Sequence, residues 1–431
     1  MKKIKLVMVI MLFVLSVFTG CSSTEKTASS DASKNESGNK PVQLKYWVPF
    51  SGGDGDFMKA MVAEFNKTNS DIQVEMLNLK WEEYYTKLRT AVASKQAPDV
   101  AVAHTSKLGE LAPSNLIAEL DQIAPNAGIE WDSFNQNILN ATVFEGKHMA
   151  IPLDTHAMIM FYNKKILGDA GLLDGDGNPD FKPGADGFID FLKQVKEKAP
   201  ADVMPFVGTS NGNVPFWMWW SLYSQMDGKL LSEDGKKAAF NNEKGKEALQ
   251  FISDLVHKDG LWPKNVKNGG EIFAAGKGAV NFNGVWSTGT FEKNQGLDFG
   301  VMTIPQLYDH EATWGDSHTL VLPVQKEDDP KRQEAAAVFA NWLAENGAMW
   351  AKAGHVPSKT EVIESEEFKS LEYRSEYVEV VDQVNFMPNS DKLFPIGDIL
   401  RANFDLVMNG QASVEEAINK AEKEVNDLLS K

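Results

Sequence analysis

Cysteine is almost absent from this chain of 431 residues, which has only Cys21. An internal disulfide is therefore excluded, although a chain of this length can bury a large hydrophobic core without one. After the first 18 residues no apolar run is long enough to span a bilayer. Positive charge is also scarce, with 43 Lys and Arg against 60 Asp and Glu, a net charge of −17. An acidic surface argues against nucleic acid as a partner and against direct adsorption to anionic lipid.

Motifs of enzymes and metal sites are equally scarce. The sequence contains neither HExxH nor GxGxxG, and its seven histidines show no metal-ligand spacing. We therefore expect no serine nucleophile elbow, no metal and no cofactor. A cell-surface glycosidase is the enzyme class that stays open, and Asp154 and Asp316 would then supply its paired carboxylates. The segment Asp174–Asp180 imitates a calcium loop, but Pro179 stands where glycine is needed and Ala185 where glutamate is needed, so a tight polar loop is favoured.

The N-terminal segment has the composition of a targeting signal. Three lysines precede Leu6–Phe18, which has one polar residue and is too short for a spanning helix. Cys21 follows small residues at the point of cleavage, an arrangement that resembles the lipobox of bacterial lipoproteins. We expect residues 1–20 to be removed, diacylglycerol to be attached to Cys21, and the mature chain to carry a net charge of −20. Residues 21–40 contain six serines and no large apolar residue, which predicts a flexible tether.

From Pro41 onward the pattern alternates between strands and amphipathic helices. The predicted order is strand, helix, strand, helix and strand, over 43–48, 56–66, 72–77, 81–94 and 100–103. This order favours a parallel α/β sheet, in which ligands bind beyond the carboxyl ends of the strands. Trp47 and Ser51 follow the first strand end, and His104 and Ser106 follow the third. We therefore expect these four side chains to face a ligand, although a single Trp at a strand end can equally be a packing residue.

A second feature is an apolar stretch that is interrupted at its centre. The segments 149–152 and 157–162 have the composition of buried strands, and Asp154, Thr155 and His156 lie between them. This pattern indicates backbone that passes from one packed domain to another, with Asp154 and His156 in the crevice. An edge strand with two solvated side chains is the alternative.

The segment Pro215–Tyr223 contains three of the eleven tryptophans. At helical spacing its aromatic residues Phe216, Trp219, Trp220 and Tyr223 form one stripe, whose default role is in the core. A tryptophan ring is also a natural platform for the apolar face of a pyranose. Core packing and sugar binding therefore both remain open, and we favour Trp219 for contact with a ligand.

Several motifs occur in an order that resembles the extracellular solute-binding proteins of bacterial ABC importers, in the family that includes maltose-binding protein and oligosaccharide-binding lipoproteins. The resemblance covers 44–429. It rests on Trp47 after the first strand and on APDV (97–100), EGKHMAIP (145–152), FYNKKIL (161–167), FAAGKGAVNFNGVW (273–286), GVMTIP (300–305), AGHVPS (353–358) and the closing SVEEAINKAEKEVNDLL (413–429). It implies two α/β lobes that are joined by hinge strands and close on a ligand in the cleft. The implied N-terminal lobe comprises 41–153 and 309–360, and the C-terminal lobe comprises 154–308 and 361–431.

The resemblance also implies site residues. His156 occupies the position of an acidic sugar contact, Trp286 that of an aromatic platform, and Trp219 that of a helix aromatic. Two further platforms of maltose-binding protein are missing, because Ala103 and about Gly397 stand in their places. Simple transfer of maltose specificity is therefore not expected.

A second hinge is predicted where the chain returns to the first lobe, with Trp314, Asp316 and His318 as candidate contacts. Asp398, followed by Arg401, is a further candidate, or else half of an ordinary helix-end ion pair. The resemblance implies a monomer on the outer face of the cell membrane, lipid-anchored through Cys21. Such a protein captures a carbohydrate, typically an oligosaccharide, and passes it to the permease subunits of an ABC transporter. Binding of a non-sugar solute is the alternative within the same class.

Overall fold

The computed structural model describes residues 40–50, 53–327 and 329–431, and Pro41–Lys431 form one compact unit. Cys21, Ser51, the predicted signal segment and nearly all of the tether lie outside the described residues. Within them no helix is both long enough and apolar enough to cross a membrane. The α-helices are α1 (Asp54–Thr68), α2 (Trp81–Ala93), α3 (Thr105–Leu111), α4 (Gln136–Ala141), α5 (Lys164–Asp169), α6 (Ala185–Lys198), α7 (Asn213–Ser224), α8 (Glu243–His257), α9 (Gly269–Ala274), α10 (Thr288–Phe291), α11 (Pro330–Glu345), α12 (Gly347–Ala351), α13 (Thr360–Glu364), α14 (Glu366–Lys369), α15 (Val380–Gln383), α16 (Leu393–Met408) and α17 (Val414–Leu429).

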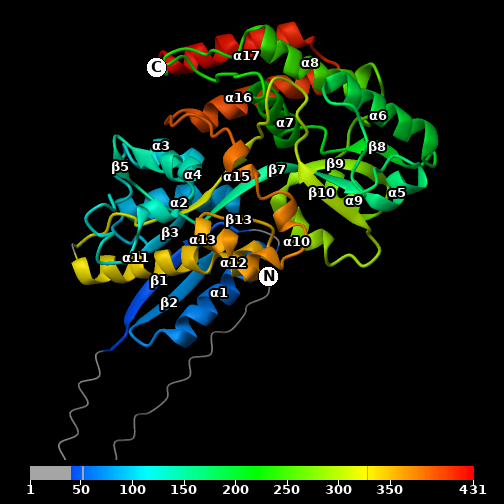
Figure 1. Cartoon of the computed structure of the whole chain (residues 1–431). Helices are drawn as coiled ribbons and strands as arrows, with labels where there is room; N and C mark the ends of the chain where they lie inside the picture. Colours follow the sequence, from blue (N-terminus) through cyan, green and yellow to red (C-terminus); the bar gives the residue numbers. More distant parts are fainter. Residues whose placement is uncertain (1–39, 51–52, 328) are drawn as a thin grey trace, which may run out of the picture. The chain divides into compact units, whose positions relative to one another are not determined.

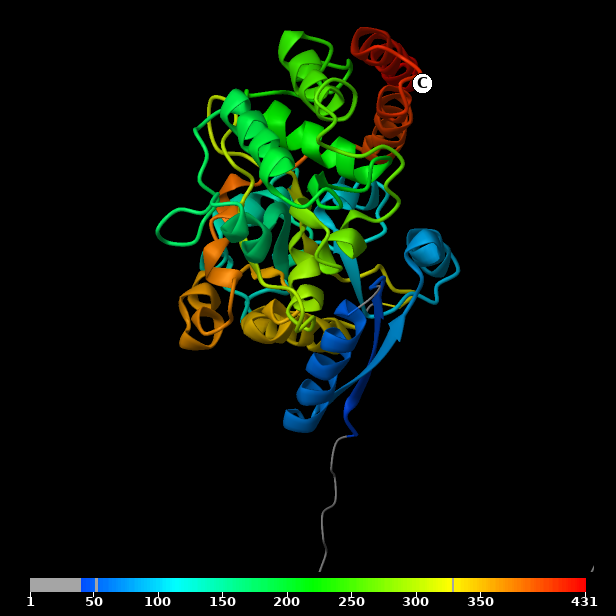
Figure 2. The same cartoon turned by 90° about the vertical axis from the view of Figure 1, so that its right-hand side faces the viewer.

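One sheet forms the centre of the first lobe, in the strand order β2-β1-β3-β12-β6. Its strands are β1 (Val42–Val48), β2 (Ile72–Asn78), β3 (Val100–His104), β6 (Ile151–Pro152) and β12 (His318–Val321). The first three are parallel, as the alternating pattern predicts, and β12 pairs antiparallel with both β3 and β6. Helices α1 and α11 pack against this sheet, and Figures 1 and 2 show α1 beside β1 and β2 in blue.

The second lobe is built on another sheet, in the strand order β10-β7-β9-β8. Its strands are β7 (Asp154–Asn163), β8 (Met204–Val207), β9 (Gly278–Gly284) and β10 (Phe299–Thr303). Strand β7 is buried along its whole length, between antiparallel neighbours β9 and β10. Strand β10 lies at an edge of this sheet and pairs only with β7 among the described strands.

Three segments connect the two lobes, and all of them meet β7. The first runs from β6 through Leu153 directly into β7. The second is β11 (Gly315–Asp316), which pairs with β7 and continues into β12 of the first sheet. The third is β13 (Val356–Pro357), which also pairs with β7 and follows α12. The predicted crossing between the lobes is confirmed, but Asp154, Thr155 and His156 do not interrupt a strand, because they belong to β7 and pair with β13 and β11.

The hydrophobic cores follow this division. One core lies between the first sheet and α1 and α11, and a larger one joins β7 and β9 to α6, α7, α8, α16 and α17. In α6 the apolar stripe of Phe188, Phe191, Leu192 and Val195 is fully buried, as its helical spacing predicts. Figure 1 shows α8, α16 and α17 lying together, and contacts between all three pairs agree with this arrangement. The lobe boundaries at 153, 308 and 360 stay predictions.

Candidate ligand-binding cleft

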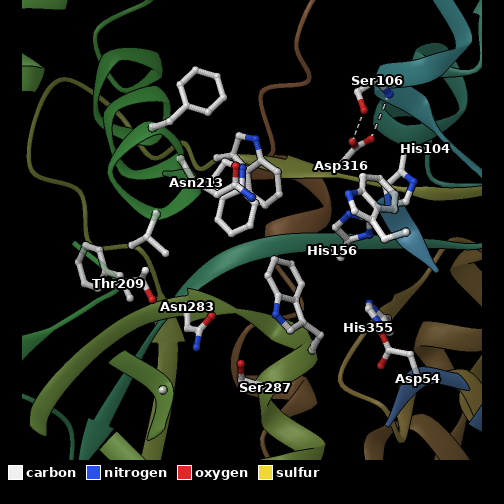
Figure 3. Close-up of a pocket in the computed structure, with 18 of the residues that line it drawn as sticks. Asp54, His104, Ser106, His156, Thr209, Asn213, Asn283, Ser287, Asp316 and His355 are labelled. Carbon is white, nitrogen blue, oxygen red and sulfur yellow. Dashed lines mark hydrogen bonds and ion pairs between the residues drawn. The ribbon is translucent and has the colours of Figure 1, made fainter. Parts of the chain in front are cut away.

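A cleft of about 910 Å³ is lined by side chains from both lobes. The first lobe contributes the loop after β1, the start of α2, the end of β3 and the start of β12. The second lobe contributes α7, α9, β9 and α16. Figure 3 shows His104, Ser106 and Asp316 on one side of this space and Thr209, Asn213 and Asn283 across from them. Ligands at such an opening can contact both lobes at once.

Three tryptophans form an aromatic wall on the second-lobe side, which we define as Trp217, Trp286 and Trp314. They come from α7, from the short 3-10 helix Val285–Ser287 and from the loop before β11. The rings of Trp217 and Trp314 stack with centroids 4.2 Å apart, and the ring of Trp286 stands edge-on to both. Trp217 and Trp286 are only partly buried, so apolar ring surface remains open to the cleft. The predicted positions of Trp286 and Trp314 are therefore in the cleft.

Trp219 does not belong to this wall, and its predicted contact with a ligand is wrong. Its side chain is fully buried, its ring stacks on Tyr223, and its indole N–H donates a hydrogen bond to the Gly245 carbonyl over 2.9 Å. Two residues along a helix turn a side chain by about 200°, so Trp217 points away from the buried stripe. The sequence left the role of the stripe open, and the structure places it in the core, whereas Trp217 lies outside the stripe and lines the cleft.

Polar side chains of the second lobe surround the aromatic wall. They include Thr209, Asn213, Asn281 and Asn283. The amide nitrogen of Asn281 donates to the Val207 carbonyl over 2.7 Å, but its carbonyl oxygen is buried without a partner. A buried polar atom without a hydrogen bond is costly, so this oxygen favours a ligand with a hydroxyl or N–H group. These side chains were not predicted from the sequence, although Asn283 and Gly284 lie directly before the predicted platform Trp286 in the chain.

Asp316 lines the cleft but already has several partners within the protein. One of its oxygens accepts hydrogen bonds from the Thr105 hydroxyl and from the backbone N–H groups of Ser106 and Ser317. The other accepts the Ser106 hydroxyl over 2.5 Å. Asp316 therefore ties β11 to the start of α3, as the dashed lines in Figure 3 show. Ser106 lies in the cleft as predicted, with its hydroxyl proton directed at this carboxylate.

A histidine–aspartate cluster occupies the point where the three connecting segments meet. We define it as Asp154, His156, His318 and His355, which bring one possible metal-ligand atom each to within 4.8 Å of one another. Asp154 is completely buried, so it cannot touch a ligand in the cleft as predicted. Its carboxylate contacts Nδ1 of His156 over 3.1 Å, Nδ1 of His318 over 2.7 Å and the indole N–H of Trp350 over 2.6 Å. Three of the seven histidines therefore lie close together in the structure, although their spacing in the sequence did not predict it.

The cluster strongly perturbs its own ionisation. Burial alone would raise the pKa of Asp154, but His318, His355 and His156 overcome this effect and hold that pKa well below its usual range. Burial lowers the pKa of His318 despite the opposing Asp154. Burial also opposes a charge on His355, yet Asp54 and Asp154 outweigh it, so the pKa of His355 is raised. Two carboxylates around one imidazole explain this opposite shift.

The remaining histidine of the cleft is His104 at the end of β3, as predicted. Its Nδ1 lies 2.8 Å from the Tyr85 hydroxyl, and its ring meets that of His318 edge-on at 4.7 Å. Burial, followed by the proximity of His318 and His156, lowers the pKa of His104 well below its usual value. Its neutral form therefore faces the cleft, where it can exchange hydrogen bonds with a polar ligand.

Two further predictions have different outcomes. Trp47 does not line the cleft, because its half-buried ring packs against the cluster around Tyr84 and Leu88. Trp81 at the start of α2 lines the cleft instead, with 40% of its surface exposed. Asp398 does line the cleft and is exposed, and its Oδ1 accepts a hydrogen bond from Arg401 over 2.5 Å. Asp398 therefore forms the ion pair and also lines the cleft, and its contact with a ligand stays a prediction.

The sequence does contain the residue pattern of a serine nucleophile elbow, contrary to expectation. Gly208–Gly212 has the sequence GTSNG, which fits GxSxG and lies between β8 and α7. Its serine, Ser210, is 1% exposed, and its hydroxyl oxygen accepts the N–H of Val266 over 2.8 Å. Within the described residues no histidine ring hydrogen-bonds to it, so the activating base of a nucleophile elbow is missing.

Comparisons with known proteins agree with this architecture. The chain is 26% identical to a diacetylchitobiose-binding protein of Streptomyces coelicolor over 275 residues, which cover 61% of this chain and only 60% of that relative. It is 22% identical to a maltooligosaccharide ABC transporter solute-binding lipoprotein of Streptococcus pneumoniae, over 76% of this chain and 75% of the relative. The GacH receptor of Streptomyces glaucescens, crystallised unliganded and with acarbose, superposes with a TM-score of 0.78 at 20% identity, over 90% of this chain and 99% of that one. The two-lobe α/β fold is thereby confirmed.

The family assignment rests on a match to a family model that covers more than half of the chain. Residues 60–374, nearly three quarters of the chain, match the family described as bacterial extracellular solute-binding protein. The matched range includes both strands of the main crossing, the aromatic wall and the histidine–aspartate cluster. The chain therefore belongs to the family of bacterial extracellular solute-binding proteins.

Proposed function

We propose that the protein captures a carbohydrate in the cleft and presents it to the permease of an ABC transporter. The aromatic wall is the observation that carries this proposal. Tryptophan ring faces stack on the C–H face of a sugar, and hydroxyl groups need donors and acceptors around the ring edge. Asn281, Asn283 and Thr209 stand beside the wall and supply them. The named ligands of the three relatives, diacetylchitobiose, maltooligosaccharides and acarbose, favour an oligosaccharide.

Catalysis is the weaker alternative. A glycosidase needs two carboxylates that flank the scissile bond, about 5–10 Å apart. Asp154 is sealed beneath the cleft and Asp316 is occupied by hydrogen bonds from Thr105, Ser106 and Ser317. Neither is available in the role that the glycosidase hypothesis gave it, so we propose that the sugar leaves unchanged.

The test is a thermal-shift screen followed by isothermal titration calorimetry. The panel contains oligosaccharides of N-acetylglucosamine, glucose and arabinose with their monosaccharides, and it also contains amino acids and polyamines. We expect one oligosaccharide series to bind and to be recovered intact by mass spectrometry. Binding of only a non-sugar solute would contradict the carbohydrate assignment, and a cleaved sugar would support the enzyme.

We further propose that the chain is anchored through lipid on Cys21. The cysteine lies directly after a signal-like segment, and one relative is named as a lipoprotein. Replacement of Cys21 by Ser removes the only thiol, so the variant should be released into the medium while the wild type stays with the membrane. Fractionation of cells checks this, and full retention of Cys21→Ser in the membrane fraction would rule out the anchor.

A further inference from the structure

We propose that the histidine–aspartate cluster binds one divalent transition-metal ion of the Zn²⁺ type. The site is distinct from the aromatic wall, and the proposal does not depend on the nature of the solute. Its residues are separated widely in sequence, at 154, 156, 318 and 355, which is why their spacing gave no signal. The three connecting segments bring them together.

The donor set is the one that such an ion prefers. Zn²⁺ binds imidazole nitrogen and carboxylate oxygen, normally with four ligands in a tetrahedron. With bonds of about 2.0–2.2 Å, neighbouring ligand atoms lie roughly 3.3–3.6 Å apart. Asp154 Oδ2 is 2.7 Å from Nδ1 of His318 and 3.7 Å from Nδ1 of His355, and Asp154 Oδ1 is 3.1 Å from Nδ1 of His156. One ligand atom from each of the four residues lies within 4.8 Å of the others, so small side-chain shifts bring them to tetrahedral spacing.

His355 supplies the observation that points to a cation. Its Nδ1 is buried and has no hydrogen-bond partner, although it lies 3.7 Å from Oδ2 of Asp154. Its other nitrogen, Nε2, lies 3.3 Å from a carboxylate oxygen of Asp54. A histidine that donates Nε2–H to a carboxylate presents its Nδ1 lone pair, which is how metal-binding histidines are oriented. Figure 3 shows His355 and Asp54 facing each other at the edge of the cleft.

The rest of the surroundings also resemble a supported metal site. The ring of His355 stacks on Trp350 with centroids 4.7 Å apart, which fixes its plane. Trp350 and the backbone N–H of His318 each donate a hydrogen bond to Asp154, so the carboxylate is held in place from behind. Gly354 precedes His355 with φ of +120°, and a Cβ there would lie 2.0 Å from the Val285 carbonyl oxygen. Only glycine fits at this position, and it sets where His355 stands.

A proton is the competing occupant of the gap between His355 and Asp154. A protonated Nδ1 would have to reach over 3.7 Å, which is beyond a good hydrogen bond. A metal ion between the two atoms instead satisfies both at ordinary bond lengths. On binding, His156 and His318 coordinate through Nδ1 and carry their proton on Nε2, and any extra proton on His355 leaves to solvent.

The position of the site predicts a structural consequence. Asp154 and His156 belong to β7, His318 begins β12, and His355 immediately precedes β13. One ion would therefore tie together all three segments that connect the lobes. We expect it to stabilise the folded chain by binding only the native state.

The test uses the chain purified without a histidine tag and treated with EDTA, which is then removed. Titration with Zn²⁺ in a calorimeter should give one saturable site, and the unfolding temperature should rise. Co²⁺ should give the intense visible absorption of a tetrahedral ion with nitrogen and oxygen ligands. His355→Gln removes a ligand and should weaken Zn²⁺ binding at least tenfold, because even the loss of a supporting hydrogen bond typically costs about 10–100-fold.

Two further variants complete the experiment. Asp54→Asn leaves all four ligands in place and should weaken Zn²⁺ binding by about 10–100-fold. This variant tests the proposal even if His355→Gln does not fold. His148→Gln is the matched control, since His148 also contacts a carboxylate, that of Asp121 over 2.6 Å, but lies outside the cluster. It should bind Zn²⁺ like the wild type. Absence of a saturable site, or equal binding by wild type and His355→Gln, would overturn the proposal and leave the gap to a proton.

Discussion

The two sides of the cleft are built on opposite principles. In the aromatic wall, the rings of Trp217 and Trp286 are partly exposed and that of Trp314 is nearly buried. The three rings contact one another and leave apolar surface exposed to the cleft. The histidine–aspartate cluster is buried, and its polar atoms are mostly satisfied by one another. The wall thus leaves surface for a ligand, whereas the cluster holds together the backbone that connects the lobes. Conspicuous residues in the sequence of a binding protein can therefore either contact the ligand or hold the connecting segments together.

The largest expected effect concerns the buried face of α7. Trp219→Ala removes a fully buried ring and its hydrogen bond to the Gly245 carbonyl. Loss of a core Trp costs about 3–5 kcal/mol, so the free energy of unfolding should fall by that amount. Urea denaturation measures it. A variant with unchanged stability would mean that the ring is not part of the core.

The second effect tests whether the histidine–aspartate cluster stabilises the folded chain. Asp154→Asn keeps the shape of the side chain but removes the charge that faces three histidines. Since hydrogen bonds to charged groups contribute about 1.5–3 kcal/mol, stability should fall by that range. Asp121→Asn, which faces only His148 and is partly exposed, should cost no more than about 1 kcal/mol. Equal losses in the two variants would remove the distinction between cluster and ordinary ion pair.

A smaller effect should distinguish ligand contact by Trp217 from core packing by Trp219, which lies on the same helix α7. Trp217→Ala removes open ring surface from α7 and should weaken saccharide binding by about 1–3 kcal/mol, with little change in stability. Trp47→Ala is the matched control outside the cleft and should leave affinity unchanged. Calorimetry with the best saccharide of the screen gives both numbers. The comparison of the two sides fails if Trp217→Ala binds as tightly as the wild type.

Much of this architecture follows from the sequence because it depends on local patterns. The parallel order of β1, β2 and β3, the stripe of α6, and the cleft positions of His104, Ser106, His156 and Trp286 were all predictable. The exchange of Trp219 for Trp217 was not, because the sequence does not say which face of a helix the second lobe covers. His355 was missed because its partners Asp154, His156 and His318 are all distant from it in the chain. Side chains gathered by a crossing of strands carry no spacing that a motif can describe.

Closure of the cleft on a sugar is the central claim, and small-angle X-ray scattering tests it most directly. A ligand that touches both lobes favours the closed form through its differential contacts. The radius of gyration should therefore decrease when the best saccharide of the screen saturates the protein, and Trp217→Ala should need more saccharide to reach the same decrease. An unchanged radius of gyration at saturation, with binding verified by calorimetry, would contradict the account.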